Sequence, residues 1–204
     1  MKKVLRFAMV CTLVFATACK KDTKEQKVEV DEVITETKDN PETQETKDIA
    51  GRDGNSVWVV MESKSGSSVG GHIIFEQNDD VVTMVAAITG LEPGTSHAIH
   101  LHESSDCSAE DGTSAGGHWN PTGQPHGEWG ASAGYHKGDI GNFTSSDDGR
   151  GTLTFSTNEW CIGCGDETKD ILGKAVIIHQ GEDDFVTQPT GAAGGRISCG
   201  GVIE

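Results

Sequence analysis

Positive charge is scarce in this 204-residue chain. Lys and Arg together number 16, against 32 Asp and Glu, which leaves a formal net charge of −16. Proteins that bind nucleic acids present a basic face to the phosphate backbone. The charge balance therefore argues against nucleic acid as a partner, and the length predicts one folded domain with appended segments.

Long apolar runs are missing except at the N-terminus, which excludes a polytopic membrane protein. There, Lys2, Lys3 and Arg6 precede an uncharged stretch over residues 7–18. This stretch is too short to span a bilayer as a stable helix, but it has the length of the apolar part of a secretory signal. We therefore expect residues 1–18 to be a signal peptide.

The uncharged stretch ends in Ala16-Thr17-Ala18-Cys19. Small residues before a Cys resemble a bacterial lipoprotein cleavage signal, although Ala16 stands where a large aliphatic residue is usual. Lipidation of Cys19 would anchor the protein to a membrane surface without spanning it. The alternative is an ordinary signal peptide cut near Ala18, with Cys19 left free. We expect a protein of the periplasm or cell envelope, held to a bacterial membrane through lipid only.

Gly, Trp and Tyr are absent from residues 1–50, whereas all 27 Gly and all four Trp lie in residues 51–204. Residues 20–50 are mostly Lys, Asp, Glu, Thr and Gln, and they can bury too little apolar surface to offset their chain entropy. We therefore expect residues 19–52 to be a disordered acidic tether and residues 53–204 to be the folded domain.

Short β-rich runs separated by turn residues dominate the folded part. Asn78-Asp79-Asp80, for example, separates two such runs and predicts a hairpin. Eight runs predict an all-β fold, either an antiparallel sandwich or a barrel. The predicted strands are 57–61, 71–77, 81–89, 96–103, 139–143, 151–156, 174–180 and 197–203. Residues 104–138 lack periodicity, and a loop of that length is usually functional.

Four Cys follow residue 19, and an even number in an exported domain indicates disulfides. Cys161 and Cys164 form a CxxC, which is compatible with zinc binding, redox chemistry or a tight disulfide. No second CxxC and no βαβ pattern accompany it, so a local disulfide is favoured. The other bridge would then join Cys107 to Cys199.

Histidine is concentrated where a metal site would need it. His100 and His102 lie on one face of a predicted strand, because side chains alternate with a period of two. Three His and one Asp form a zinc set, and three or four imidazoles suit copper. Since there are seven candidates for eight ligand positions, one imidazole would have to bridge two ions. The candidates are His100, His102, His118, His126, His136, Asp139 and His179.

Four ordered segments resemble copper/zinc superoxide dismutase. They are HAIHLHE (97–103), GGHWNP (116–121), YHKGDIGN (135–142) and GGRISCGGVI (194–203). The resemblance covers essentially all of residues 55–204. It implies an eight-stranded antiparallel Greek-key barrel, an immunoglobulin-like sandwich with long metal-binding loops. The Cys107–Cys199 pair matches the disulfide of that family.

The resemblance also implies a role for each residue of the cluster. Copper would be bound by His100, His102, His118 and His179, and zinc by His118, His126, His136 and Asp139. His118 would be the bridge between the two ions. Asp183 would link a copper-binding His to a zinc-binding His and orient both rings. Arg196 would attract the anionic substrate to copper, whereas His97 is placed near the site and His72 is given no role.

The reaction implied is disproportionation of superoxide to oxygen and hydrogen peroxide, as antioxidant defence outside the cytoplasm. Copper would alternate between Cu(II) and Cu(I), zinc would keep its charge, and His118 would take up and deliver a proton. A non-catalytic copper-binding or copper-delivery module on the same barrel is the alternative, and a structural lipoprotein with vestigial sites is a third reading. Family members are monomers or dimers, and a homodimer is favoured here.

Two features depart from the family pattern. The segment 183–196 is short and contains no Lys, although this region often steers superoxide in the family. Residues 51–204 hold seven basic and 22 acidic residues, so the anion would be repelled at long range unless Arg196 and Lys137 offset the charge. The second departure is the insert 160–164, which we expect to clamp the entry to the strand that carries His179.

Overall fold

A computed structural model of the chain describes residues 55–204. The predicted signal peptide, the proposed lipidation site Cys19 and the whole predicted tether lie outside the described residues. Eight strands form the domain, together with one short 3-10 helix, η1. They are β1 (Ser56–Ser63), β2 (Gly70–Asn78), β3 (Val81–Thr89), β4 (Ser96–His102), η1 (Thr113–Ala115), β5 (Asp139–Thr144), β6 (Gly151–Thr157), β7 (Ala175–His179) and β8 (Arg196–Gly201).

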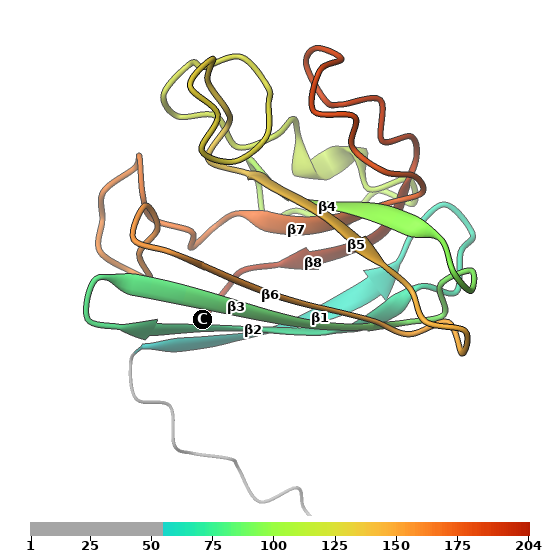
Figure 1. The fold of residues 1–204 in the computed structure, drawn as a ribbon. Helices are drawn as coiled ribbons and strands as arrows, with labels where there is room; N and C mark the ends of the chain where they lie inside the picture. The colour runs from blue at the N-terminus through green and yellow to red at the C-terminus, as the bar shows by residue number, and fades with distance from the viewer. Residues whose placement is uncertain (1–54) are drawn as a thin grey trace, which may run out of the picture. The chain divides into compact units, whose positions relative to one another are not determined.

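The strands pair antiparallel in the order β5-β4-β7-β8-β1-β2-β3-β6. The chain crosses between the two halves of this sheet from β3 to β4 and again from β6 to β7, and these long crossovers are Greek-key connections (Figure 1). The end strands β5 and β6 contact each other, so the sheet is nearly closed into a barrel. The predicted all-β Greek-key barrel is therefore confirmed, and all eight predicted strands are present with bounds that differ by one or two residues.

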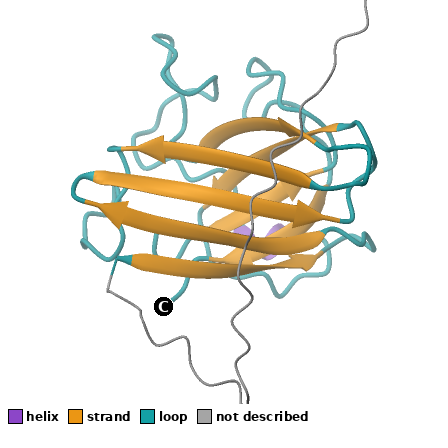
Figure 2. Cartoon of the chain, turned by 60° about the horizontal axis from the view of Figure 1, so that its bottom comes forward, coloured by secondary structure: helices purple, strands orange, loops and turns teal. Residues whose placement is uncertain are grey.

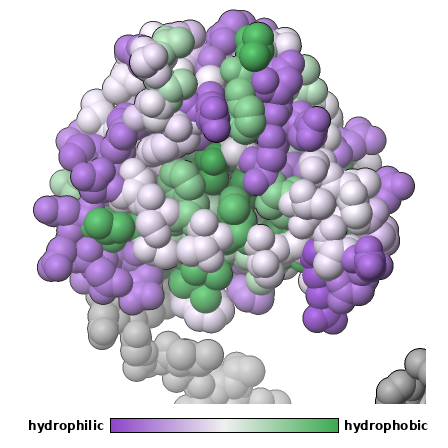
Figure 3. All heavy atoms as spheres, viewed as in Figure 1, coloured by the Kyte–Doolittle hydropathy of each residue, from purple (hydrophilic) through white to green (hydrophobic). Residues whose placement is uncertain are grey.

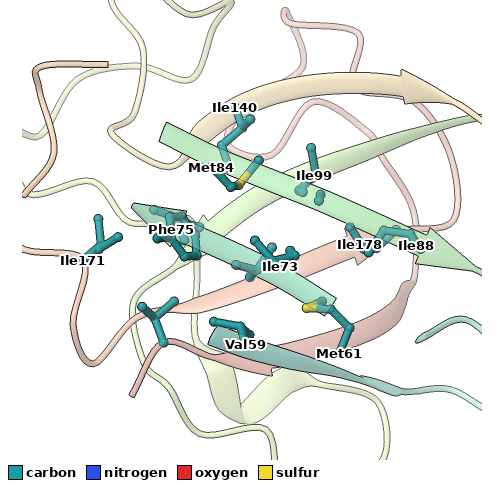
Figure 4. Packing of buried hydrophobic residues seen from close by; sticks show 14 of the residues in the cluster. Val59, Met61, Ile73, Phe75, Met84, Ile88, Ile99, Ile140, Ile171 and Ile178 are labelled. Carbon is teal, nitrogen blue, oxygen red and sulfur yellow. The ribbon is translucent and has the colours of Figure 1, made fainter. Parts of the chain in front are cut away.

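The core lies between the two halves of the barrel. On β1 the side chains of Val57, Val59 and Met61 are buried and those between them are exposed, because a strand with one covered face buries every second residue. Ile73, Phe75, Met84 and Ile88 meet them from β2 and β3 (Figure 4). Burial of such side chains contributes about 1.5–3 kcal/mol each.

Strands β4 and β7 differ from β1 because both of their faces are covered. Ile99 and Leu101 point into the core. The alternating residues, His100 and His102, point outward and are still buried. The loop over residues 103–138 and the segment 180–195 lie together over this outer face (Figure 1). The loops therefore form a second, polar interior on the outside of the barrel.

The opposite half, β1, β2, β3 and β6, presents an outer face of strands with loops at its edges (Figure 2). Trp58 and Val60 are exposed there, and Trp58 stacks on His72 at 6.0 Å between ring centroids. At the side where β5 and β6 meet, apolar side chains gather between hydrophilic ones (Figure 3). Residues 55–204 contain no helix that is long and apolar enough to cross a membrane.

Candidate metal centre

His100 and His102 lie on the covered outer face of β4, and both are fully buried. Leu101, between them, points into the core, as the alternation predicts. β7 runs beside β4 and ends at His179, which brings a third imidazole to the same place. The ring centroids of His100 and His179 are 5.0 Å apart.

The loop after β4 adds a fourth imidazole. His118 forms an isolated bridge with His102, which holds the loop backbone against the end of the strand. The centroid of its ring lies 4.0 Å from that of His100. The resulting set of buried His side chains offers ligand atoms within 4.8 Å of one another. This four-imidazole set consists of His100, His102, His118 and His179.

The second set includes a carboxylate. Asp139 is the first residue of β5 and is fully buried, which only charge-compensating neighbours make tolerable. His126 and His136 approach it from the same loop, with ring nitrogens 3.0 and 3.3 Å from its two oxygens. His118, His126, His136 and Asp139 also have ligand atoms within 4.8 Å of one another.

His118 belongs to both sets, and its two ring nitrogens face different ways. Its Nδ1 lies 2.8 Å from Asp139 Oδ1, whereas its Nε2 is buried without a hydrogen-bond partner. One imidazole can therefore serve the four-imidazole set through Nε2 and the carboxylate set through Nδ1. The structure brings together all seven residues that the sequence analysis singled out.

Each of the six His carries one buried ring nitrogen without a partner. Buried polar atoms in this condition are rare and call for an explanation such as an ion. The unpartnered atoms are His100 Nδ1, His102 Nε2, His118 Nε2, His126 Nδ1, His136 Nδ1 and His179 Nε2. Nitrogen lone pairs that converge on two points fit divalent metal ions, so the residues present suit a two-metal centre.

In five of these six His the other ring nitrogen has a hydrogen-bond partner, His118 Nδ1 with Asp139 being one case. His100 Nε2 and His126 Nε2 donate to the two oxygens of Asp183, at 2.8 and 2.9 Å. His102 Nδ1 donates to the Gly116 carbonyl at 3.0 Å, and His179 Nδ1 is 3.2 Å from the carbonyl of residue 194. Because each of these nitrogens carries the proton, the opposite nitrogen keeps the lone pair that a metal needs.

His97 has a supporting position in the structure. It is buried, and its Nδ1 donates to the His179 carbonyl at 2.9 Å. Its Nε2 lies 2.7 Å from the Thr95 hydroxyl. His97 therefore holds the backbone of His179 in place. The sequence predicted that His97 lies near the site but did not identify this contact.

Burial keeps part of the cluster uncharged. Desolvation lowers the pKa of His118 to about 4 and that of His179 to about 3. Burial would also lower the pKa of His126, but hydrogen bonds to Asp139 and Asp183 outweigh it and raise that pKa to about 9. Hydrogen bonds from the surrounding His outweigh burial at Asp139 and hold its pKa well below the usual range. His118 and His179 are thus neutral at pH 7, the form in which imidazole binds metals.

Arg196, the first residue of β8, lies at the edge of the four-imidazole set. Its guanidinium donates to the carbonyls of Gly112 and Gly116, at 2.7 Å each. The Gly116 carbonyl is the same oxygen that receives His102 Nδ1. Burial is the main cause of the lowered pKa of both His102 and His179, and the neighbouring His add to it. The positive charge of Arg196 makes a further, smaller contribution.

Two disulfides are present in the described residues. Cys107 is bonded to Cys199 across 92 residues, which ties the long loop to β8. Cys161 is bonded to Cys164, three residues away. The first disulfide therefore fixes the part of the loop that holds the Arg196 guanidinium.

The set of His118, His126, His136 and Asp139, here called the carboxylate set, has one support that was not evident from the sequence. Trp160 is buried, and its indole Nε1 donates to the Lys137 carbonyl at 2.9 Å. Glu159 accepts a hydrogen bond from the Tyr135 hydroxyl at 2.7 Å and forms an ion pair with Lys137. Residues 159–160 thus hold residues 135–137, which flank His136. The ion pair also means that Lys137 is not the free positive charge that the sequence suggested.

The comparisons with known proteins agree with this geometry. Residues 69–203 match the family model described as copper/zinc superoxide dismutase (SODC). Similar solved structures include a SOD-like protein from Bacillus subtilis and a double mutant of it. The former is 31% identical with a TM-score of 0.64, and the latter is 33% identical with a TM-score of 0.65. Each match covers 72% of this chain and 97% of the other.

A further similar structure is the clock protein EA4, which is 29% identical over 73% of this chain and 95% of that one, with a TM-score of 0.63. The family model covers well over half of this chain, and it includes every residue of both ligand sets. On this match and on the shared fold, the chain belongs to the copper/zinc superoxide dismutase family.

Proposed function

We propose that the protein is an exported superoxide dismutase that uses copper and zinc. Two superoxide anions and two protons would give one oxygen and one hydrogen peroxide. The observation that carries this proposal is the position of His118, whose two nitrogens face two separate ligand sets. A single metal-storage site would have no use for an imidazole shared in this way.

The chemistry of the donors assigns the metals. Four imidazoles, His100, His102, His118 and His179, suit copper, and three imidazoles with one carboxylate, His118, His126, His136 and Asp139, suit zinc. When bound, copper supplies one-electron exchange between Cu(II) and Cu(I), and zinc supplies a positive charge that does not change. Asp183 orients one ligand of each set and keeps their protons on the outward nitrogens.

His118 is the residue that we propose to move a proton. Its Nε2 is buried and has no other partner, so a proton taken up there would be held for delivery to the nascent peroxide. Its Nδ1 is held by the Asp139 set throughout. A zinc ion held on the Nδ1 side would lower the cost of giving that proton up.

Arg196 is proposed to bind the superoxide anion. Its guanidinium is held by two carbonyls beside the four-imidazole set, so its charge is fixed before the substrate arrives. It shares the Gly116 carbonyl with His102, which places the anion-binding charge next to a proposed copper ligand. Preorganised donors of this kind need no rearrangement during the reaction.

We further propose that the domain acts outside the cytoplasm, anchored through a lipid on Cys19. The basic residues and the apolar stretch of residues 1–18 support export, and the two disulfides suit an oxidising compartment. A homodimer is the proposed oligomeric state. Mass spectrometry of the membrane fraction would identify a lipidated Cys19, and an unmodified N-terminus would refute the anchor.

The test of the proposed activity is superoxide decay followed by stopped-flow absorbance, with copper and zinc content measured on the same sample. Protein with one copper and one zinc per chain should consume superoxide catalytically. His100→Ala should lose copper and activity together, and Arg196→Ala should keep its metals but react more slowly. Protein that holds both metals without consuming superoxide would instead be the copper-binding or copper-delivery module, and the enzyme proposal would be wrong.

A further inference from the structure

Lys64 is a buried cation to which neither ligand set assigns a role. It directly follows β1, and only 9% of its side chain is exposed. Its Nζ donates to the Cys107 carbonyl at 2.5 Å, and the carboxylate of Glu62 is 3.5 Å away. A buried ammonium is costly unless it is well paired, so this contact indicates a specific purpose.

The turn that begins at Lys64 also holds the start of β8. The Lys64 amide donates to the Ile197 carbonyl at 3.0 Å, and the hydroxyl of Ser67 donates to the same oxygen at 2.5 Å. The hydroxyl of Ser65 donates to the Arg196 carbonyl at 2.8 Å. This turn therefore fixes the backbone at Arg196 and at the residue that follows it.

The same turn holds the loop that receives the Arg196 guanidinium. The Ser65 amide donates to the Glu110 carbonyl at 2.7 Å, and Lys64 Nζ holds the Cys107 carbonyl. Gly112, whose carbonyl accepts from the guanidinium, lies between the two cationic side chains. A side-chain carbon on Gly112 would be 3.4 Å from the Arg196 side chain and 3.7 Å from Lys64 Cγ.

We propose that Lys64 is a positioning residue for Arg196, an inference that rests on the proposed role of Arg196 in anion binding. The Lys64 main-chain amide holds the backbone next to Arg196, and the Lys64 ammonium, through the Cys107 carbonyl, holds the loop whose carbonyls accept from the guanidinium. Only the second contact depends on the Lys64 side chain. The disulfide ties that loop to β8 at Cys199, two strand positions beyond the residues that the turn holds.

Azide, a small anion that binds Cu(II), probes the position of Arg196 without requiring turnover. Lys64→Met should raise the azide dissociation constant of the copper- and zinc-loaded chain roughly fivefold, the size expected of a residue that acts through others. Lys64→Arg keeps a cationic donor and should stay within about twofold of the parent protein. Lys174→Met is the matched control, because Lys174 is also a partly buried cation, but its ammonium lies over Trp119, outside residues 107–116.

Hydrogen–deuterium exchange measures the opening of the loop backbone directly, and it does not require that the protein consumes superoxide. Amides in residues 107–116 should exchange faster in Lys64→Met than in Lys64→Arg or Lys174→Met. If Lys64→Met does not fold, Ser65→Ala removes only the bond to the Arg196 carbonyl and should weaken azide binding about twofold. Unchanged azide binding and exchange, or a Lys64→Arg variant as weak as Lys64→Met, would overturn the proposal. Failure of the superoxide assay alone would refute the proposed activity and leave this test standing.

Discussion

His100 and His126 belong to different ligand sets, yet both donate a hydrogen bond to the carboxylate of Asp183, one to each oxygen. The carboxylate is fully buried and comes from the segment after β7. The orientation of one proposed copper ligand is therefore coupled to that of one proposed zinc ligand.

Asp183→Asn should weaken the binding of both metals. An amide cannot accept from two imidazoles through two oxygens, so at least one ring loses its partner. Loss of such an outer contact typically costs 10–100-fold in metal affinity, and competition with a chelator would measure it. Asp184→Asn is the control, because Asp184 is exposed and accepts only from its own turn. Equal affinities in the two variants would contradict the coupling.

Trp160→Phe should destabilise the carboxylate set without touching a ligand. The substitution keeps an aromatic ring in the core but removes the donor to the Lys137 carbonyl. A buried carbonyl left without its partner costs about 1–3 kcal/mol. We expect a matching drop in the free energy of unfolding in urea, together with faster zinc release. Glu167→Gln, on an exposed residue of the neighbouring loop, should change neither quantity.

The two disulfides should differ in their effect on stability. On the chain-entropy model, the bridge across 92 residues contributes about 4–5 kcal/mol and the bridge across three residues about 2 kcal/mol. The double variants Cys107→Ala/Cys199→Ala and Cys161→Ala/Cys164→Ala, compared by denaturant unfolding, would test this. Equal losses would show that the length of the closed loop is not what decides the effect.

The metal-free protein should lose stability as the pH falls from about 6.5 toward 4. An unfolded His has a pKa of about 6.5, whereas folded His118 and His179 have values of about 4 and 3. In this window the unfolded chain binds protons that the folded chain does not, so acid favours unfolding, by up to about 1.4 kcal/mol per pH unit for each imidazole. Urea unfolding of the EDTA-treated protein at several pH values would measure the slope.

The raised pKa of His126 acts in the opposite direction. Its contribution is fully present below about pH 6.5 and is lost as the pH rises through about 9. His179→Gln should therefore reduce the acid-side slope, while His126→Gln should change the slope only between about pH 6.5 and 9. A flat profile between pH 7 and 4 would show that these imidazoles do not titrate as their burial demands.

Added salt should leave kcat/KM unchanged or raise it. Residues 51–204 carry a net charge of −15, and the ion pair with Glu159 occupies Lys137, so long-range forces repel superoxide. Screening of exposed charges weakens that repulsion as ionic strength rises. Rate measurements between about 0.01 and 0.2 M salt would test this. A steep fall in rate would contradict it and would indicate attraction toward the site.

Predictions from the sequence succeeded where the evidence was periodic or local. The β-rich runs at residues 57–61 and 81–89 predicted strands, and both are present as part of longer or equal strands. The spacing of His100 and His102 placed both rings on one face of β4, because side chains alternate along a strand. Residues 104–138 offered no periodicity, so the convergence of His118, His126 and His136 could be inferred only through the family resemblance.

The sequence by itself determined the all-β class, the seven candidate ligands and the acidic charge, because these depend on residue type, on local spacing and on the motifs that carry the family resemblance. Only the tertiary structure decided which nitrogen of each His is left free, that Lys137 is neutralised by Glu159, and that Lys64 and Trp160 support the site. These are contacts between segments far apart in the chain. Their partners are chosen by how loops fold over β4 and β7, which no local pattern encodes.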